Sequence, residues 1–320
     1  MKRRDFITLL GGTVVWPVAA WAQQRKLPRI GALTLTNVDA LSYGKELREG
    51  LRELGLVEGQ GYAFESLSAD GNAARLAELA AELVARKVDV IAAIFTPCAL
   101  AAKQATREIP IFAIAGDPIG TGLVTGLARP GANITGLSNM GAETAGKCIE
   151  LLRDMVPSLR RAAVLANPVD PFTKSFVEQV QLAGRTAGIE IGPVAMVRGI
   201  DEVEAAFSAM AAERAGAVVV PAIFFPKTVA DMAIKHRLPA ASIVRAFADD
   251  GGLMTYGADI PHMYRRSAAF VHKFLLGTKP ADLPVEQPTK FELAINLKTA
   301  KAIGLAIPET FLLRADKVIE

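Results

Sequence analysis

The sequence is poor in the residues that build metal sites and disulfide scaffolds. Its 320 residues include only two cysteines, Cys98 and Cys148, and three histidines, His236, His262 and His272. The histidines share no metal-ligand spacing with cysteine or carboxylate residues, so we expect no metal site. The two cysteines fall in parts of the chain that we assign below to different lobes, which predicts free thiols and not a disulfide.

Long runs of one charge sign are also missing beyond the N-terminus. The formal net charge is +3, and no polybasic run follows the first few residues, so we expect no nucleic-acid partner. The chain is 51% hydrophobic and 22% charged, a composition that buries a large core and argues against disorder. A chain of 320 residues is long enough for one large domain or two medium ones.

Residues 1–22 are predicted to be an export signal. A basic segment, Lys2-Arg3-Arg4, precedes a mildly apolar stretch, and Ala20-Trp21-Ala22 fits a small-x-small cleavage site. The apolar stretch is too short, and too rich in glycine and proline, for a spanning helix. The arginine pair resembles a twin-arginine signal, and the Sec route remains an alternative. We therefore expect a periplasmic protein whose mature chain begins near Gln23.

Apolar strands alternate with helices in the first part of the chain. Leucines recur at helical spacing at positions 47, 51 and 54, and again at 76, 79 and 83. The expected strands cover residues 29–35, 62–67, 88–95, 110–115 and 134–137. The third of these is apolar after Asp89, as a central parallel strand should be. Strands that alternate with helices predict right-handed crossovers and a parallel sheet with helices on both faces.

The same pattern then starts again. A helix over 142–155 leads to Arg161–Asn167, which repeats the order of Arg29–Asn37: a basic residue, an apolar strand and an asparagine-containing loop. Further strands are expected over 190–197, 217–221 and 239–243. The chain is therefore predicted to form two similar α/β lobes and not one long sheet.

The last part of the chain predicts crossings between the lobes. A long helix over 261–276 and an extended, proline-rich stretch over 280–288 precede a last strand over 291–297 and a last helix over 298–303. Because these do not all fit the second lobe, we expect the chain to return to the first lobe and cross again. The prediction is two doubly wound, Rossmann-like α/β lobes joined by crossing hinge segments, a clamshell. Lobe one is assigned to residues 28–138 and 258–285, and lobe two to 139–257 and 286–320.

Ligands of such sheets bind beyond the carboxyl ends of the strands, so we expect a site in the cleft between the lobes and closure about a hinge. Thr96-Pro97 follows the strand over 88–95 directly and begins a helix rich in small residues. The unpaired N–H groups at a helix N-terminus suit a carboxylate. Thr96 either caps this helix or donates its hydroxyl to the ligand, and the sequence leaves both roles open.

Other strand ends carry short polar side chains, a few carboxylates and almost no basic groups. This pattern favours a zwitterion, with its amine beside Asp39, Asp117 or Asp170, over a polyphosphate. Each aspartate also suits a turn or a cap. The predicted ligand-binding residues are Asn37, Asp39, Thr96, Pro97, Cys98, Asp117, Asn139, Asn167, Asp170, Ala222 and Tyr256. The candidates for an apolar wall of this site are Tyr43, Phe95, Phe172, Phe224, Phe225 and Tyr256.

Several segments resemble one known family. They are Met1–Gly12, Thr96-Pro97 with Ala99–Lys103, Gly116–Pro118, Leu127–Gly136 and Leu283–Glu292, and they extend over nearly the whole chain. They resemble the substrate-binding proteins of bacterial ABC transporters, a family whose better understood members take up tryptophan and tyrosine. The resemblance implies the type I periplasmic binding protein fold and a small-molecule receptor without chemistry of its own, which delivers an amino acid or aromatic acid to an ABC permease in the inner membrane.

Two alternatives to transport remain open from the sequence. A ligand-sensing receptor that feeds a membrane signalling protein uses the same clamshell. An exported α/β enzyme needs a nucleophile with a base or a convergent carboxylate pair, and no local motif indicates either. The glycine-rich run over 120–126 has the wrong spacing for a dinucleotide site, so we expect no cofactor. We expect a monomer.

Overall fold

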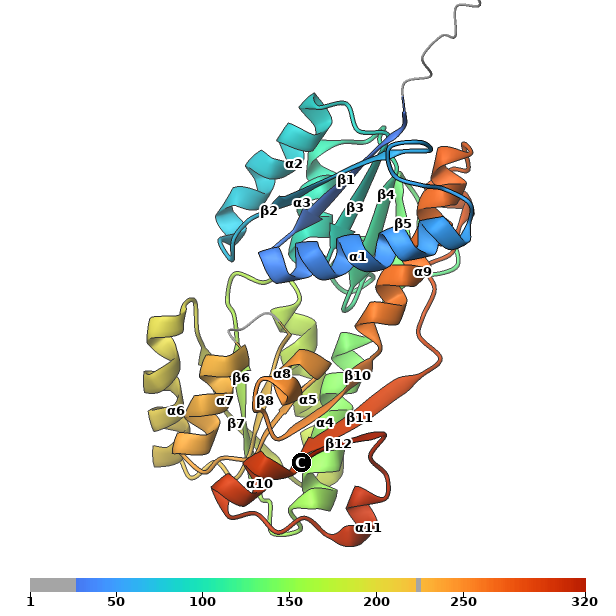
Figure 1. Ribbon diagram of the computed structural model, residues 1–320. Helices are drawn as coiled ribbons and strands as arrows, with labels where there is room; N and C mark the ends of the chain where they lie inside the picture. The colour runs from blue at the N-terminus through green and yellow to red at the C-terminus, as the bar shows by residue number, and fades with distance from the viewer. Residues whose placement is uncertain (1–26, 223–225) are drawn as a thin grey trace, which may run out of the picture.

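The computed structural model describes residues 27–222 and 226–320. The predicted export signal and two residues considered for the apolar wall, Phe224 and Phe225, lie outside the described residues. The described chain forms two lobes, each built on its own sheet (Figure 1). Within these ranges no helix combines the length and the apolar character needed to cross a membrane.

Lobe one is built on a five-stranded sheet in which neighbouring strands run parallel. In sheet order the strands are β2 (Ala63–Ser68), β1 (Arg29–Thr34), β3 (Val90–Ile94), β4 (Ile111–Ala115) and β5 (Ile134–Ser138). β3, β4 and β5 are buried along their whole length, which explains their unbroken apolar or small-residue sequences.

Two pairs of helices cover the two faces of this sheet. The helical segments of lobe one are α1 (Asn37–Glu53), η1 (Ala73–Arg75), α2 (Leu76–Ala85), α3 (Thr96–Ala105), α9 (Ile260–Leu275) and η3 (Pro280–Asp282). α2 and α3 pack with one face, whereas α1 and α9 pack with the other (Figure 1). α9 comes from the late part of the chain, so lobe one is not continuous in sequence.

Lobe two is built on a seven-stranded sheet. In sheet order its strands are β12 (Lys317–Ile319), β11 (Phe291–Asn296), β10 (Met254–Ala258), β9 (Ala240–Ser242), β8 (Val218–Val220), β6 (Arg161–Ala166) and β7 (Glu190–Met196). β11 is antiparallel to β10, and the other neighbours are parallel. The prediction that residues 291–297 form the last strand was wrong, because β12 follows it.

The helices of lobe two also lie on both faces of the sheet. They are α4 (Gly141–Met155), α5 (Thr173–Ala187), η2 (Ile200–Glu202), α6 (Val203–Ala212), α7 (Pro226–Lys235), α8 (Arg245–Asp249), α10 (Leu297–Ile303) and α11 (Glu309–Leu312). One core joins α4, α5, α10 and α11, and a second joins α6, α7 and α8. The helix predicted to be the last, α10, is followed by α11. The short pairing of β12 with β11 and this short helix left no clear apolar period in the sequence.

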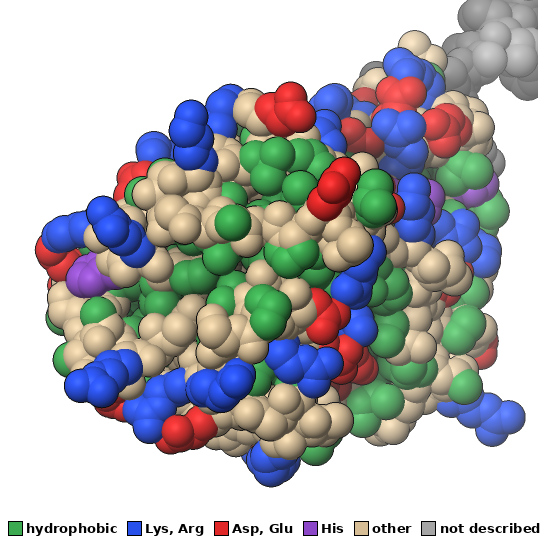
Figure 2. Space-filling model, turned by 90° about the horizontal axis from the view of Figure 1, so that it is seen from below, with side chains coloured by type: hydrophobic (Ala, Val, Ile, Leu, Met, Phe, Trp, Pro, Cys, Tyr) green, Lys and Arg blue, Asp and Glu red, His purple; other side chains and the backbone are tan. Residues whose placement is uncertain are grey.

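The end of lobe two is thus formed partly by elements that lobe one does not have. Figure 2 views the molecule from this end and shows hydrophobic side chains across the middle of the face, with most charged side chains around its margin. The C-terminal segment contains the strongly exposed Leu313. These additions extend the second sheet beyond the part that repeats the first.

The repeat predicted from the sequence is confirmed by the strand order. Lobe one has the order β2-β1-β3-β4-β5, and part of lobe two has the matching order β7-β6-β8-β9-β10. The fold is α/β with two parallel-sheet lobes, as expected. In both sheets the carboxyl ends of the parallel strands lie at the edge nearer the other lobe (Figure 1).

The chain crosses between the lobes at three places. Asn139 and Met140 join β5 to α4, Asp259 joins β10 to α9, and residues 287–290 lead into β11. Before the last crossing, the chain pairs with the edge of the first sheet, where Glu286 accepts a hydrogen bond from the Ser138 N–H at 2.8 Å. Three crossings next to one another allow the lobes to rotate about a common hinge.

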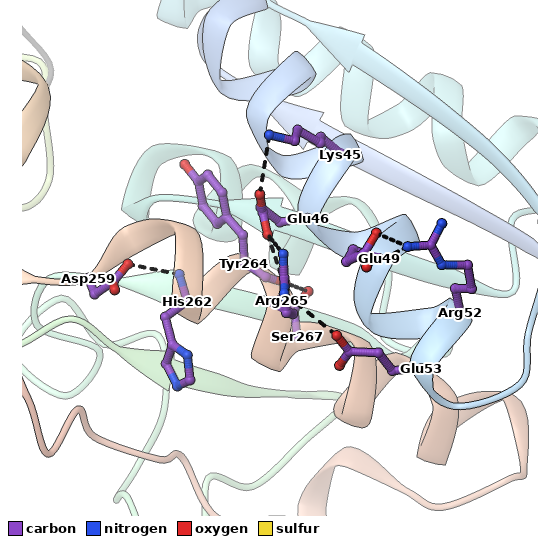
Figure 3. Close-up of polar contacts among 10 residues, drawn as sticks. All are labelled: Lys45, Glu46, Glu49, Arg52, Glu53, Asp259, His262, Tyr264, Arg265 and Ser267. Atoms are coloured by element: carbon purple, nitrogen blue, oxygen red, sulfur yellow. Dashed lines mark hydrogen bonds and ion pairs between the residues drawn. The ribbon is translucent and has the colours of Figure 1, made fainter.

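The contact between α1 and α9 holds the returning helix on lobe one. Figure 3 shows Arg265 of α9 against the acidic face of α1. Its guanidinium donates to the Glu46 carboxylate at 2.7 Å and lies 3.6 Å from that of Glu53. Beneath these ion pairs, Tyr43 and Tyr264 pack edge to face with ring centroids 5.4 Å apart. The Tyr264 ring points away from the Arg265 contacts in the same view (Figure 3).

Candidate ligand site between the lobes

One cavity is lined by residues of both lobes and of the first crossing segment. Its lining residues are Phe95, Thr96, Pro97 and Gly116 of lobe one, Asn139 of the crossing segment, and Asp170, Phe172, Ala222 and Ile243 of lobe two. All of them follow the carboxyl ends of parallel strands, namely β3, β4, β5, β6, β8 and β9. This is where ligands of doubly wound sheets bind. A larger hollow of about 330 Å³ lies at the opposite end of lobe one, away from these strand ends.

The start of α3 presents its N-terminus to the cavity. Phe95 is the N-cap residue, with φ 70° and ψ 162°, a region that non-glycine residues rarely occupy. Such a conformation costs on the order of 1–3 kcal/mol and is found mostly at functional sites. Ala99 is the residue whose N–H first bonds within the helix, to the Phe95 carbonyl. The N–H groups of Thr96 and Cys98 therefore precede the helical ladder, and Pro97 has none.

Thr96 does not cap this helix. It is the first residue of α3, and the N-cap position belongs to Phe95, whose side chain makes no capping bond. The Thr96 hydroxyl instead accepts a hydrogen bond from the Gly116 N–H at the end of β4, at 3.4 Å. Thr96 is 2% exposed. The capping alternative is therefore wrong, because the unusual backbone of Phe95 moves the helix start one residue earlier than expected.

Asn139 brings an unpaired acceptor to the cavity from the hinge itself. Its backbone N–H donates to the Ala115 carbonyl at 2.9 Å, which fixes the residue beside the end of β4. The side chain is 7% exposed, and its Oδ1 has no hydrogen-bond partner among residues 27–222 and 226–320. A buried acceptor without a donor is costly, on the order of 1–3 kcal/mol. A ligand N–H or O–H group at this place would satisfy it.

Asp170 supplies a buried carboxylate from lobe two. Its Oδ1 accepts the Phe172 N–H at 3.0 Å, and its side chain is 8% exposed. Burial raises the pKa of Asp170 to about 6, although the bond from Phe172 lowers it. Its partner is a neutral N–H group, and none of the ion pairs within residues 27–222 and 226–320 involves Asp170, so no cation of this part of the chain offsets its desolvation. An ammonium group in the cavity would do so.

The other predicted polar residues make local contacts outside the cavity lining. Asp39 accepts the Thr36 hydroxyl at 2.7 Å, and burial raises its pKa. Asp117 accepts the Gly120 N–H at 2.8 Å. The remaining two are Asn37, which donates to Asp70, and Asn167, which accepts the Val169 N–H. The contacts of Asp39, Asp117 and Asn167 are the turn and cap roles that short polar residues favour, whereas Asn37 joins α1 to the loop after β2.

Cys98 and Tyr256 also lie outside the cavity lining. Cys98 is fully buried in the lobe-one core, where burial raises the pKa of its thiol. Cys148 is buried in α4 of lobe two, and burial raises the pKa of that thiol to about 12. Both thiols are free, as predicted from their separate lobes. The Tyr256 ring stacks on Phe291 within lobe two, at 5.8 Å between centroids.

Apolar residues complete the lining. Phe95 and Phe172, both considered for the wall, lie at the cavity, whereas Tyr43 is buried in the lobe-one core. No motif in the sequence singles out Ile243, and Gly116 was noted only as part of the segment Gly116–Pro118 that resembles the family. The available signal was their position at a strand end: Ile243 is the last residue of the predicted strand over 239–243, and Gly116 directly follows the one over 110–115. Among the described residues, no group of three or more His, Cys, Asp or Glu side chains has the arrangement of a metal site.

Comparison with known families agrees with this architecture. A family described as "ABC transporter substrate binding protein" matches residues 34–319. The chain belongs to this family of substrate-binding proteins. The family match covers both lobes and all the residues that line the cavity.

Individual relatives of this substrate-binding protein share about a quarter of its residues. A tyrosine-binding protein of Clostridioides difficile strain R20291 is 26% identical over 290 residues, which cover 88% of this chain and 82% of the relative. A solved conserved domain protein of Vibrio cholerae is 26% identical with a TM-score of 0.86, and the match covers 92% of this chain and 100% of that one. A domain from Streptococcus pneumoniae solved in complex with L-Trp is 27% identical with a TM-score of 0.84 and the same coverage. The fold is that of the type I periplasmic binding proteins.

Proposed function

We propose that this protein is the extracytoplasmic substrate-binding component of an ABC importer. Its ligand is a small carboxylate-bearing solute, an amino acid or an aromatic acid, held in the cavity between the lobes. The observation that carries the proposal is the pairing of opposite charges across one cavity. Lobe one offers a helix N-terminus, and lobe two offers the Asp170 carboxylate.

The carboxylate of the ligand is assigned to the start of α3. The N–H groups of Thr96 and Cys98 have no partner within the helix, and the helix dipole places about half a positive charge there. The Thr96 hydroxyl accepts from Gly116 and still has its own proton to donate. Small residues after Pro97 let a ligand approach the backbone.

The amine of the ligand is assigned to the opposite wall. Asp170 offers an ionised carboxylate at neutral pH, and the Asn139 Oδ1 offers an acceptor that has no partner within the described residues. An ammonium group donates up to three hydrogen bonds and would satisfy both. The separation of charges favours a zwitterion over a simple anion. The names of two relatives, a tyrosine-binding protein and a domain bound to L-Trp, support an amino acid.

Isothermal titration calorimetry on the purified protein tests this assignment. Each amino acid that binds is compared with its methyl ester, which lacks the carboxylate, and with its deaminated acid, which lacks the amine. We expect both analogues to bind at least about tenfold more weakly, since each loses a charge-assisted contact of about 1.5–3 kcal/mol. A monosaccharide serves as the control. Equal affinity for an amino acid and its deaminated acid would contradict the role of Asp170.

Export and partnership with a permease are tested in cells. N-terminal sequencing of the cell-extracted protein should return a chain that begins near Gln23, whereas a chain that begins at Met1 would exclude cleavage. Replacing Arg3-Arg4 by Lys-Lys should block export if the twin-arginine route is used. Deletion of the permease should abolish uptake of the bound solute, while the purified protein still binds it.

A further inference from the structure

The Phe172 ring reaches from lobe two to lobe one and fills part of the space between them. A Cβ atom built on Gly116 of lobe one would lie 2.5–2.8 Å from three carbons of this ring. One built on Gly141, at the start of α4, would lie 3.0 Å from the same ring. Neither glycine has a positive φ, so at Gly116 it is the ring and not the backbone that excludes a side chain, whereas at Gly141 the ring and Asn139 Oδ1 leave little room for one. The ring thus packs against two glycines at the edge of the cavity.

Several contacts hold this ring in place. Phe172 is 7% exposed and belongs to the lobe-two core. Its ring lies 5.9 Å from that of Phe176, one turn further along the chain, and its backbone N–H is bound by Asp170. Turning the ring out of the cleft would break the packing with Phe176 and with both glycines. Phe172 is therefore anchored within lobe two and lies at the cavity, next to the carboxylate assigned to the ligand amine.

The cavity that remains beside this ring is small. Its volume is about 20 Å³, whereas one water molecule needs about 10–15 Å³. Engineered apolar cavities that bind benzene have volumes of about 150 Å³. A solute with a short side chain fits after a small widening of the lobes. An indole or phenol group needs the space that the Phe172 ring fills.

We propose that Phe172 determines the ligand class and restricts the site to amino acids with short side chains, such as glycine, alanine and serine. The proposal rests on the proposed function, because it narrows the ligand of the same cavity. It separates this protein from the relatives whose names give tyrosine and L-Trp. The packing of Phe172 against Gly116 and Gly141 is the feature that imposes the limit.

The test is calorimetry with glycine, L-alanine, L-serine, L-tyrosine and L-tryptophan on the purified protein and on Phe172→Ala. We expect the wild-type protein to bind L-alanine at least about tenfold more tightly than L-tryptophan. Phe172→Ala should reverse this preference by at least about tenfold, because it opens space for a ring. Phe207→Ala is the matched control, since Phe207 is buried in α6, in the other core of lobe two, and does not line the cavity. It should leave the preference unchanged.

A second pair of variants tests the contact with Gly116 directly. Gly116→Ala places a methyl group against the Phe172 ring, so it should weaken binding of L-alanine by at least about tenfold. In the Phe172→Ala background the same change should have no effect on affinity, because the obstacle is gone. If Phe172→Ala does not fold, Phe172→Leu removes the aromatic ring with less loss of volume and is measured against the same ligands.

The outcomes separate the two proposals. Wild-type protein that binds L-tryptophan or L-tyrosine more tightly than L-alanine would overturn the size limit and leave the proposed function intact. An unchanged ratio of affinities in Phe172→Ala, or in Phe172→Leu if that variant replaces it, would also overturn the size limit. If neither the wild-type protein nor the variant binds any of these amino acids, the size limit is overturned, and the proposed function is then tested with aromatic acids.

Discussion

The two lobes share one strand order but present different groups to the cavity. After β1 of lobe one, Asp39 accepts the hydroxyl of Thr36 and lies outside the lining. After β6, the corresponding strand of lobe two, Asp170 accepts one backbone N–H and lies at the cavity. Burial raises the pKa of both carboxyl groups. The segments that follow the two corresponding strands therefore each carry an aspartate that is at least partly buried. Asp39 has a side-chain partner, whereas among the described residues Asp170 is bound only by a backbone N–H.

A second difference lies after the third strand of each repeat. In lobe one, α3 begins directly after β3 and its N-terminus lies at the cavity. In lobe two, Ala222 follows β8 and lines the cavity with a methyl group. Lobe one thus offers N–H groups, and lobe two offers a carboxylate and apolar surface. The repeated strand order therefore places two sheet edges opposite each other, but the residues that the two edges present to the cavity differ.

The carboxylate of lobe two should matter most for binding. Asp170→Asn removes its charge and should weaken amino-acid binding roughly tenfold to a hundredfold, since a hydrogen bond to a charged group contributes about 1.5–3 kcal/mol. Asp39→Asn, the equivalent change in lobe one, should alter affinity less than about threefold, because Asp39 does not line the cavity. Calorimetry on both variants checks this difference. An equal loss of affinity in the two variants would show that the carboxylate of lobe two has no special role in binding.

The hydroxyl of lobe one should matter somewhat less. Thr96→Val keeps the shape of the side chain and removes the hydroxyl, so affinity should fall about tenfold. The free energy of unfolding should fall by about 1 kcal/mol, because the Gly116 N–H loses its acceptor while the helix keeps its N-cap. Thr96→Ser retains the hydroxyl and should bind nearly normally. Affinity unchanged in Thr96→Val would remove this residue from the site.

The raised pKa of Asp170 predicts opposite pH effects on binding and on stability. Its pKa is about 6 in the folded protein, above the ordinary 3.8. Affinity for an amino acid should therefore fall about tenfold between pH 7 and pH 5, as the carboxylate becomes protonated. The ligand-free protein should gain stability over the same interval, because the folded state then no longer carries a buried charge.

The pH prediction is checked by calorimetry and by thermal unfolding of the ligand-free protein. The stability that Asp170 contributes is fully present below about pH 3.8 and is lost as the pH rises through about 6. Asp170→Asn is the control and should flatten both profiles. Profiles that stay unchanged in the variant would assign the effect to another group, such as Asp39.

The smallest effect is expected far from the cavity, where α9 is held on lobe one (Figure 3). Arg265→Ala removes ion pairs with Glu46 and Glu53. We expect a loss of about 1 kcal/mol or less in unfolding free energy, since Arg265 and Glu53 are exposed and only Glu46 is largely buried. Arg52→Ala is the control, because Arg52 pairs with Glu49 inside α1 alone. Thermal unfolding compares the two. Affinity should not change in either variant, and a loss of binding in Arg265→Ala would link this contact to the hinge.

The sequence by itself determined the repeated α/β pattern and the positions of the strand ends. Unbroken apolar strands followed by small or polar residues are local features, so Thr96-Pro97, Asn139 and Asp170 could be selected from the residue pattern alone. The return of the chain to lobe one could also be predicted from the sequence, because the helix over 261–276 did not fit the second lobe. The added β12 was missed, since three residues paired with an edge strand leave almost no periodic signal.

Only the tertiary structure decided which candidates face one another. Asn37, Asp117 and Asn167 have the same residue types as the cavity residues, but their side chains form hydrogen bonds elsewhere: Asn37 with Asp70, and the other two within their own loops. The left-handed φ of Phe95 set where α3 begins. The ring of Phe172 meets Gly116 because two lobes, distant in sequence, close on each other. Side-chain direction depends on backbone conformation and on packing between elements, and neither can be read from a residue and its sequence neighbours alone.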